Sequence, residues 1–340
     1  MASGTALTAD GMTSMTQVVA GSDVIDDADF NNARTNVNLL LGNAYDITLG
    51  TYDPTFTYGW GQGGAGVNAA SAGGLVYADN ATGGFKRLQD DVQAMCAFLG
   101  VALRTGVGTD VVSGNTITAA TWNNLMLNIQ DCWNDRFGPA SVTDATPTSK
   151  TFTSTWYTSL TQETTFTFAS EAACRAYFNG GGGLGFSASR TLGSNTTQNT
   201  NWTDTLSAMG SVFMEHDTAV GSSGTNAGIG LYELGTGYTT IWTKYGSGSY
   251  ASNFFKIEGK VNSTTNPTVV TLKATWSDPH ATGAGALGPD GIAGTGDESY
   301  NNDYIDGTMT LNARTRTPAA SGSGFSFTAP TVSMGNITGS

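Results

Sequence analysis

The sequence IDDADFNN at residues 25–32 returns in related form as ITAATWNN at residues 117–124. An offset of 92 residues relates the two stretches, and it also aligns Asn36 with Asn128 and Val37 with Ile129. An aromatic residue, an Asn pair, a further Asn and a β-branched residue therefore recur at fixed spacings. This agreement indicates an internal repeat, and the repeat determines how the first part of the chain folds.

Each copy of the repeat carries the signals of a capped α-helix. Asp26 and Thr118 stand where an N-cap side chain accepts hydrogen bonds from free backbone N–H groups. Apolar residues follow at helical spacing, namely Phe30, Val37, Leu40 and Leu41 in the first copy and Trp122, Leu125, Ile129 and Trp133 in the second. Gly42 and Gly138 are the predicted stops, and Pro139 reinforces the second one.

A third, diverged helix is predicted between the two copies. Its apolar residues are Phe85, Leu88, Val92, Met95 and Leu99, and Gly100 ends it. Three helices of roughly 12–17 residues can enclose one small core. The Gly-rich aromatic segment that ends in GWGQGG at residues 59–64 is predicted to pack its rings on a neighbouring element.

From about Thr143 the pattern changes to that of β-strands. Residues 164–168 alternate Thr and Phe, the period of a half-buried strand. Further strands are predicted at 151–157, 184–189, 211–214, 228–233, 239–244, 253–261, 268–276 and 308–313. One helix at 202–209, capped by Thr200 or Asn201, interrupts them. Short strands separated by Gly, Ser and Asn are typical of a sandwich or barrel.

These patterns predict an α+β chain. A small, mainly helical N-terminal domain with the internal repeat covers residues 1–140, an all-β, sandwich-like domain covers 141–317, and an extended tail covers 318–340. The linker is predicted at 139–150, which is small and polar and holds Pro139 and Pro147. The tail carries Phe325 and Phe327. It is either an arm that pairs with another strand or subunit or an unordered end.

The composition excludes several classes of protein. Charged residues are 12% of the chain, the net charge is −13, and Lys and Arg number only 14. Nucleic acids and anionic membranes are therefore poor partners, because both require a basic surface. The N-terminus lacks the blocks of a secretory signal, and no apolar run approaches the ~20 residues of a membrane span. Cys96, Cys132 and Cys174 are predicted to be buried small hydrophobes in a reducing cytoplasm.

Side chains suited to catalysis are scarce. His216 and His280 are the only histidines, the Gly-rich stretch at 180–185 lacks the Lys of a phosphate loop, and the cysteines are too far apart for zinc. A carboxylate pair could cleave a glycosidic bond, and the available acids are Asp26, Asp27, Asp29, Asp90, Asp91, Glu163 and Glu171. Those in the helical half fall at caps and polar faces. No enzymatic activity is therefore expected.

One loop is a candidate calcium site. The sequence LGPDGIAGTGDE at 287–298 continues into further acids and amides, and its candidate ligands are Asp290, Asp297, Glu298 and Asp303. Hard cations require six or more oxygen ligands, which such a loop can supply. The alternative is a solvated acidic loop, since the pattern is not that of a helix–loop–helix calcium site. No other cofactor is expected.

Several segments together resemble a known family. They are the repeat, YGWGQ at 58–62, RAYFNGGG at 175–182 with FSASR at 186–190, QNTNWTDTL at 198–206 and NFFKI at 253–257. In combination they resemble the virion structural proteins of tailed phages, especially cyanobacterial and other marine phages. The acidic loop at 278–306 is longer than the resemblance leads one to expect, so the resemblance implies no role for it.

The resemblance implies a non-enzymatic particle component, first of a tail fibre, baseplate or other tail appendage. A head-surface decoration or neck fibre protein is the second alternative, and a carbohydrate-binding receptor module or glycan-cleaving tailspike is the third. The expected location is the virion, after synthesis in the host bacterial cytoplasm. The expected partners are further copies of the chain, with a trimer as the first choice, other virion proteins and, for a receptor module, a host-surface glycan. Neither nucleic acid binding nor membrane insertion is expected.

Overall fold

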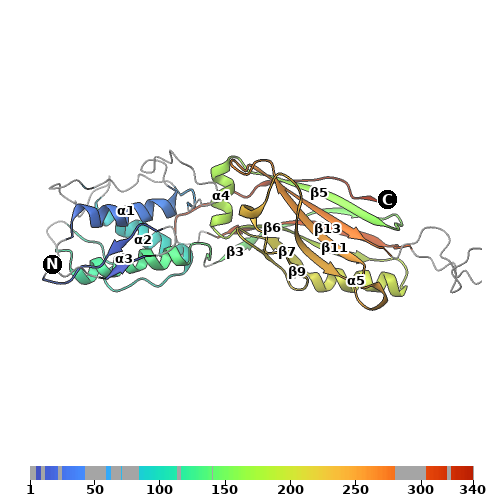
Figure 1. Cartoon of the computed structure of the whole chain (residues 1–340), viewed down its shortest axis with the longest axis horizontal. Coiled ribbons are helices and arrows are strands. Elements are labelled where there is room, and N and C mark those ends of the chain that lie inside the picture. The colour runs from blue at the N-terminus through green and yellow to red at the C-terminus, as the bar shows by residue number, and fades with distance from the viewer. Residues whose placement is uncertain are drawn as a thin grey trace, which may run out of the picture. The chain divides into compact units, whose positions relative to one another are not determined.

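The structure is a computed structural model that describes residues 5–8, 12–21, 25–42, 59–62, 70, 84–112, 116–139, 141–279, 304–319 and 323–339. The chain is mixed α+β with substantial β content, as the sequence predicts (Figure 1). The helices are α1 (Asp27–Leu41), α2 (Phe85–Leu99), α3 (Ala119–Asn134), α4 (Glu171–Asn179) and α5 (Thr197–Met209).

Two compact units make up the chain. The helical unit comprises Met1–Thr143, Arg175–Gly181 and Thr317–Thr328, and the β unit comprises Asp144–Cys174, Gly182–Arg316 and Ala329–Ser340. Each unit therefore recruits segments that are distant in the sequence. The helical unit also holds a short hairpin of β1 (Ala6–Leu7) and β2 (Met15–Thr16).

The helix caps confirm most of the predicted boundaries. Asp26 caps α1 in a reciprocal capping box with Asp29, and Thr118 caps α3 by accepting from the Thr121 N–H. Gly42 and Gly100 end α1 and α2 in the left-handed conformation, with φ of 69° and 72°. The predicted stop of α3 at Gly138 is wrong, because the helix ends at Asn134 and a separate turn links Asp135 to Gly138.

The three helices α1, α2 and α3 run in the same direction. At their N-terminal ends, the rings of Phe85 in α2 and Trp122 in α3 lie 6.1 Å apart. At the opposite ends, the Trp60 backbone N–H donates to Leu40 of α1, and the Trp60 ring lies 5.2 Å from Phe98 of α2. The Trp60 indole N–H donates to the Arg136 carbonyl, just after α3. Trp60 therefore lies where all three helices end.

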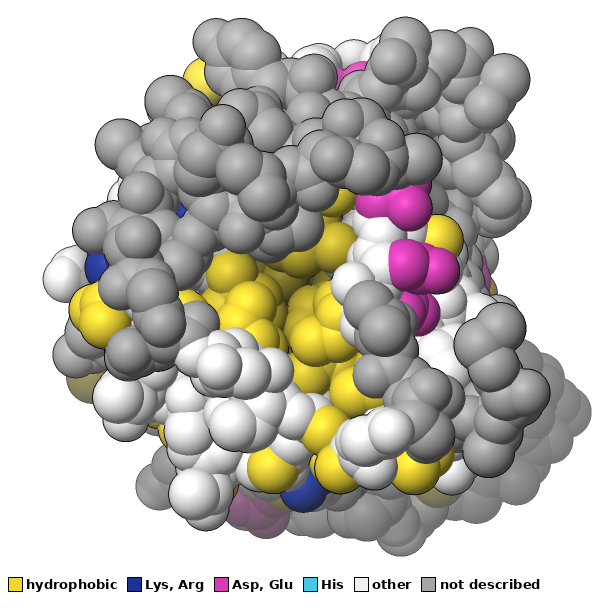
Figure 2. All heavy atoms as spheres, turned by 90° about the vertical axis from the view of Figure 1, so that its left-hand side faces the viewer, with side chains coloured by type: hydrophobic (Ala, Val, Ile, Leu, Met, Phe, Trp, Pro, Cys, Tyr) yellow, Lys and Arg dark blue, Asp and Glu magenta, His cyan; other side chains and the backbone are white. Residues whose placement is uncertain are grey.

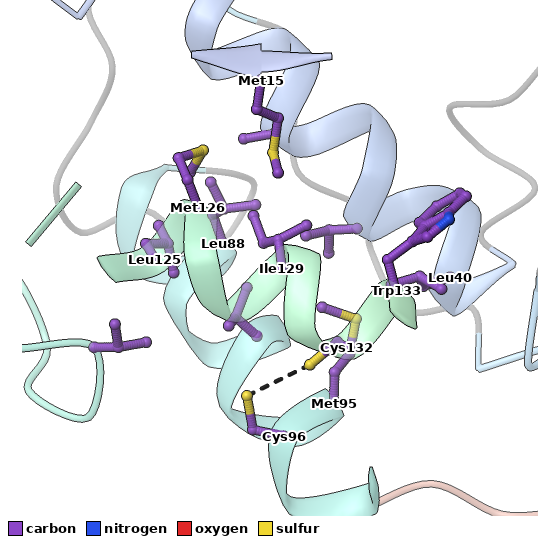
Figure 3. Packing of buried hydrophobic residues seen from close by; sticks show 14 of the residues in the cluster. Met15, Leu40, Leu88, Met95, Cys96, Leu125, Met126, Ile129, Cys132 and Trp133 are labelled. Atoms are coloured by element: carbon purple, nitrogen blue, oxygen red, sulfur yellow. Dashed lines mark hydrogen bonds between the residues drawn. The ribbon is translucent and has the colours of Figure 1, made fainter. Parts of the chain in front are cut away.

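The three helices bury apolar residues at equivalent positions of their sequences. Alignment of Phe30, Phe85 and Trp122 brings four further buried positions into register, occupied by Ala33, Leu88 and Leu125, by Val37, Val92 and Ile129, by Leu40, Met95 and Cys132, and by Leu41, Cys96 and Trp133. All are at most 4% exposed. Figure 3 shows part of this core, with Leu88, Met95, Ile129 and Cys132 between the helices. The diverged helix α2 is thus a third copy of the repeat.

The repeated Asn residues hold the extended segment that precedes each helix. The Asn36 amide accepts from the Thr13 N–H and donates to the Thr13 carbonyl, both at 2.8 Å. The equivalent Asn128 accepts from the Arg104 N–H and donates to the Ala102 carbonyl, both at 3.0 Å. Both Asn side chains are fully buried. Each amide therefore pairs with backbone as a neighbouring strand would.

A second set of polar side chains holds each segment from the adjacent helix. The Asn123 side-chain amide of α3 accepts from the Val18 N–H and donates to the Val18 carbonyl. The Asn31 amide of α1 makes the same two hydrogen bonds with Ala70. In α2, Gln89 donates to the Thr109 carbonyl and accepts from the Val111 N–H. The segments before α1 and α3 are therefore each fixed between two helices.

The β unit contains two antiparallel sheets in a sandwich-like architecture. One sheet has the order β14-β5-β12-β11-β10-β9, with β15 also on β5, and the other has the order β3-β13-β6-β7-β8, with β4 also on β13. The strands are β3 (Val142–Asp144), β4 (Thr148–Phe152), β5 (Ser159–Thr167), β6 (Gly183–Thr191), β7 (Ser211–Met214), β8 (Ala219–Val220), β9 (Thr225–Asn226), β10 (Thr239–Tyr245), β11 (Phe254–Val261), β12 (Val269–Ser277), β13 (Thr308–Pro318), β14 (Thr331–Met334) and β15 (Thr338–Gly339). Buried and more exposed residues alternate along β5, β11, β12 and β13.

Some elements differ from the prediction. The strand expected at 228–233 is a 3-10 turn, Leu231–Glu233, because Gly228 adopts a φ of 68° and the Glu233 carboxylate accepts from the Gly230 N–H. Helix α5 begins earlier than expected and is capped by Thr196. The predicted strand at 151–157 is shifted to β4, and α4 was not predicted. The tail, by contrast, follows one of its two predicted alternatives, since β14 and β15 pair with a strand, β5 of the same chain.

Removal of one repeated Asn tests the role of the buried amides. We expect Asn128→Ala to lower the free energy of unfolding by about 2 kcal/mol, because the Arg104 N–H and the Ala102 carbonyl, which are partly buried, would lose their hydrogen-bond partner. Urea unfolding followed by tryptophan fluorescence measures the change. Asn134→Ala, at the exposed end of the same helix, is the control and is expected to change stability by less than about 0.5 kcal/mol. Equal effects of the two substitutions would contradict the role.

Asp91 occupies the position of Asn36 and Asn128 in the third copy. Its side chain is 8% exposed and pairs with Arg87 at 3.0 Å, while burial raises the pKa of Asp91 to about 6 despite that pairing. The unfolded carboxyl titrates near 3.9. Between about pH 4 and pH 6 the folded state therefore binds more protons than the unfolded state, and stability falls as the pH rises.

We expect Asp91→Asn to remove this loss. At pH 7 the variant should be more stable than the wild type by about 1–2 kcal/mol, since the gain from removing a buried charge exceeds the loss of the Arg87 pair. At pH 4 the gain should disappear. Asp90→Asn, whose side chain is 41% exposed, is the matched control. A gain that is independent of pH would show that the Asp91 carboxyl does not titrate as described.

Candidate functional site

The four candidate calcium ligands, Asp290, Asp297, Glu298 and Asp303, lie outside the described residues. The structure describes both ends of their acidic loop, at Asp278 and at Asp306. Each end is fixed by side chains of α5, so this helix and its two contacts form the candidate site. We call it the loop anchor and define it by Arg190, Asn199, Asp306, Gln198, Trp202 and Asp278.

At the C-terminal end of the loop, the Asp306 carboxylate collects several hydrogen bonds. Arg190 donates to Asp306 Oδ1 at 2.9 Å, Asn199 Nδ2 donates to the same oxygen at 2.7 Å, and the Ser194 N–H and hydroxyl donate at 3.0 Å. The Arg190 side chain is only 4% exposed. Burial alone would raise the pKa of Asp306, but the bonds from Ser194 and Arg190 hold the pKa below its usual value. The carboxylate is therefore ionised at neutral pH.

This network fixes a tight corner between β6 and α5. Leu192 has a φ of 61°, unusual for a residue with a side chain, and is 80% exposed. Gly307 has a φ of 95°, and a Cβ there would lie 2.6 Å from the Leu192 carbonyl oxygen. Only a glycine fits this close approach. The Asp306 hydrogen bonds hold the corner in a conformation that the sequence alone would not favour.

At the N-terminal end of the loop, Asp278 is fully buried. Its Oδ2 accepts from Gln198 at 2.6 Å and from the Trp202 indole at 3.1 Å. The Trp202 ring packs against Trp156 at 5.4 Å, and the Trp156 backbone pairs with Ile305 at the other end of the loop. Both ends of the acidic loop are thus bound to one rigid platform.

The anchor has the chemistry of a structural support. The Asp306 oxygens already accept from four donors, and the adjacent Arg190 guanidinium repels a cation. The described residues contain no group of three His, Cys, Asp or Glu side chains that could hold a metal ion. Whether the acidic loop itself binds calcium stays a prediction. The sequence gives no sign of this role for Asp306, because its partner Arg190 is 116 residues away.

The Gly-rich run at 180–185 serves packing. A Cβ at Gly180 would lie 2.7 Å from the Phe327 ring, within the helical unit. At Gly185 of β6 a Cβ would overlap the Val212 carbonyl group of β7. Glycine is needed at Gly180 and Gly185 because neighbouring groups approach the backbone closely.

The remaining residues considered for catalysis lie on different elements. Glu163 is exposed on β5 and lies opposite Lys273 of β12. Glu171 is the first residue of α4. His216 Nε2 lies 3.2 Å from Asp217, whose side chain is 59% exposed. His280 lies outside the described residues. The three cysteines are buried, as predicted.

Hydrophobic side chains gather in a hollow on one face of the molecule, with acidic side chains beside them (Figure 2). The exposed large hydrophobic residues include Val19, Leu103 and Val112 in the helical unit and Tyr157, Leu192, Val220 and Tyr245 in the β unit. Within the described part of the chain, no helix is long and apolar enough to cross a bilayer.

Comparison of the chain with protein-family models, with curated proteins and with solved structures found no match.

The anchor predicts a strong dependence on Asp306. We expect Asp306→Asn to lower the free energy of unfolding at pH 7 by about 3 kcal/mol, because it leaves the buried Arg190 without its counter-charge. Below about pH 4 the difference from the wild type should shrink, since the wild-type carboxyl also becomes protonated as the pH falls through its lowered pKa. Asp217→Asn, at an exposed carboxylate, is the control. A difference that stays constant down to pH 2 would contradict this role of the charge.

Proposed function

We propose that the protein is a non-enzymatic structural component of a tailed-phage particle. The location in the particle that we propose first is a tail fibre, a baseplate or another tail appendage. One observation carries the proposal: the segments on which the family resemblance rests contact one another in pairs. Asn179 of RAYFNGGG donates to the carbonyl of Gly59 in YGWGQ, and Arg190 of FSASR donates to the carbonyl of Asn199 in QNTNWTDTL. Residues that share a structural role in this way are expected to recur together in related proteins.

The chemistry of the described residues supports a structural role. The repeated Asn residues, Gln62 and the loop anchor use their polar groups to hold backbone segments or each other. Low charge and exposed apolar side chains on both units suit a chain that packs against further copies and other virion proteins. In this proposal the N-terminal helical domain serves attachment or assembly, and the sandwich-like domain that follows it is the second module of the particle component.

Two other places in the particle are compatible with the same observations. A head-surface decoration or neck fibre protein would use the same folded units. A carbohydrate-binding receptor module or a glycan-cleaving tailspike would add contact with a host-surface glycan. Glu163 and Glu171 are the carboxylates to test for cleavage, although they stand on different elements.

Particle location and assembly test the proposal. We expect antibodies raised against each unit to label intact virions at the tail, and light scattering of the purified chain to give a trimer of about 105 kDa. A stable monomer at micromolar concentration, with no labelling of particles, would contradict the proposal. Labelling of the head or neck would favour the second place.

The enzymatic alternative has its own readout. Purified protein is incubated with host envelope polysaccharide, and the products are sized. We expect no release of oligosaccharides. Release that is abolished by Glu163→Gln or Glu171→Gln would show that the protein is a glycan-cleaving enzyme, and binding without cleavage would favour a receptor module.

A further inference from the structure

Two buried thiols face each other in the core of the helical unit. Cys96 of α2 and Cys132 of α3 point toward one another, with the two Sγ atoms 3.5 Å apart (Figure 3). Neither residue is exposed to solvent. Both lie in the last turns of their helices, near the ends that converge on Trp60. The two sulfur atoms are therefore in contact without being bonded.

The separation is small compared with what a disulfide requires. A disulfide places its sulfur atoms about 2.05 Å apart, so the two atoms need to approach by about 1.5 Å. The helices that carry them already pack together at the opposite end, where the Phe85 and Trp122 rings lie 6.1 Å apart. Small side-chain rotations and a slight approach of the helix ends would therefore close the bond.

We propose that Cys96 and Cys132 form a disulfide site that is closed when the chain meets a small-molecule disulfide oxidant such as oxidised glutathione. One thiol loses its proton and attacks the oxidant, which forms a mixed disulfide and releases one reduced molecule. The second thiol loses its proton and displaces the bound half, which leaves as the second reduced molecule. The two protein thiols are thereby oxidised to one disulfide, and one molecule of oxidant is reduced to two thiols.

The environment keeps the pair reduced until the helices open. The hydrogen bond with Cys96, burial, and the charges of Asp131 and Asp135 raise the pKa of the Cys132 thiol. The thiolate that attacks a disulfide is therefore scarce in the closed structure, and the oxidant has no direct access. Oxidation is slow because it requires a transient separation of α2 and α3. The disulfide is buried again when the two helices close.

The bond would join two of the three helices beside Trp60. It would also close a loop that contains the segment 101–112, which Asn128 and Gln89 hold against the bundle. Such a cross-link restricts the unfolded chain and so stabilises the folded one. Under the proposed function, on which this timing rests, the dithiol is made in the reducing host cytoplasm and the bond forms after the particle is released.

The test uses the purified, reduced full chain. It is incubated with oxidised glutathione in native buffer and sampled over a period many times longer than an unfolded sample needs to lose its thiols, because the folded chain reacts only when its helices open. The chain is then denatured in acid, alkylated and weighed. We expect the number of alkylated thiols to fall from the three cysteines of the sequence to one, with Cys174 alkylated and the peptides of Cys96 and Cys132 linked. The Tm should rise by roughly 10 °C and return to its starting value after reduction.

Two variants serve as matched controls. Cys174→Ala should keep both the bond and the gain in Tm, whereas Cys96→Ala should lose both. Because Cys96→Ala also leaves a small cavity, the reversible change in the wild-type Tm is the decisive measurement. Three alkylated thiols after the incubation, glutathione adducts without a link, or a link through Cys174 would each overturn the proposal.

Discussion

Buried amide side chains hold the extended segments of the helical unit against its three helices. Parallel helices need connections that return along the bundle, and in the described segments beside the helices the short β1–β2 hairpin pairs only part of the backbone. Each unpaired N–H or C=O near the core would destabilise the fold. Asn36, Asn123 and Asn128 supply one donor and one acceptor each, in the arrangement of a peptide group. The repeat thus encodes a helix together with the side chains that fix its connections.

The same device joins parts of the helical unit that are distant in the sequence. The Gln62 amide accepts from the Ser326 N–H and donates to its carbonyl, across 264 residues. This places Phe325 and Phe327 on the rings of Trp60 and Phe98, with ring centroids 5.3 to 5.8 Å apart. Gly59, next to Trp60, is required because a Cβ there would lie 2.5 Å from the Gly42 Cα atom. The packing role expected for this aromatic segment therefore has a definite geometry.

Local signals allowed much of the fold to be predicted. The caps at Asp26 and Thr118 and the stops at Gly42 and Gly100 are encoded within a few residues, so the helix positions followed from the sequence. The strand at 211–214 was predicted at its observed bounds for the same reason. The turn at Leu231–Glu233 was not, since its form depends on hydrogen bonds to Glu215 and His216. Partners such as Arg190 and Asp306 are set by tertiary structure, and no pattern in one sequence pairs them. The role of the acidic loop could be predicted only as a hypothesis from its composition.

The central claim concerns four backbone N–H groups outside the helices and strands. Those of Thr13, Val18, Arg104 and Val111 donate to the amide oxygens of Asn36, Asn123, Asn128 and Gln89. Hydrogen exchange of these four protons, measured by NMR in the full chain, tests the claim most directly. We expect each to exchange at least about 100-fold more slowly than in an unfolded chain. Exchange of all four within about 10-fold of the unfolded rate, while the helices stay protected, would contradict the claim that side-chain amides hold these segments.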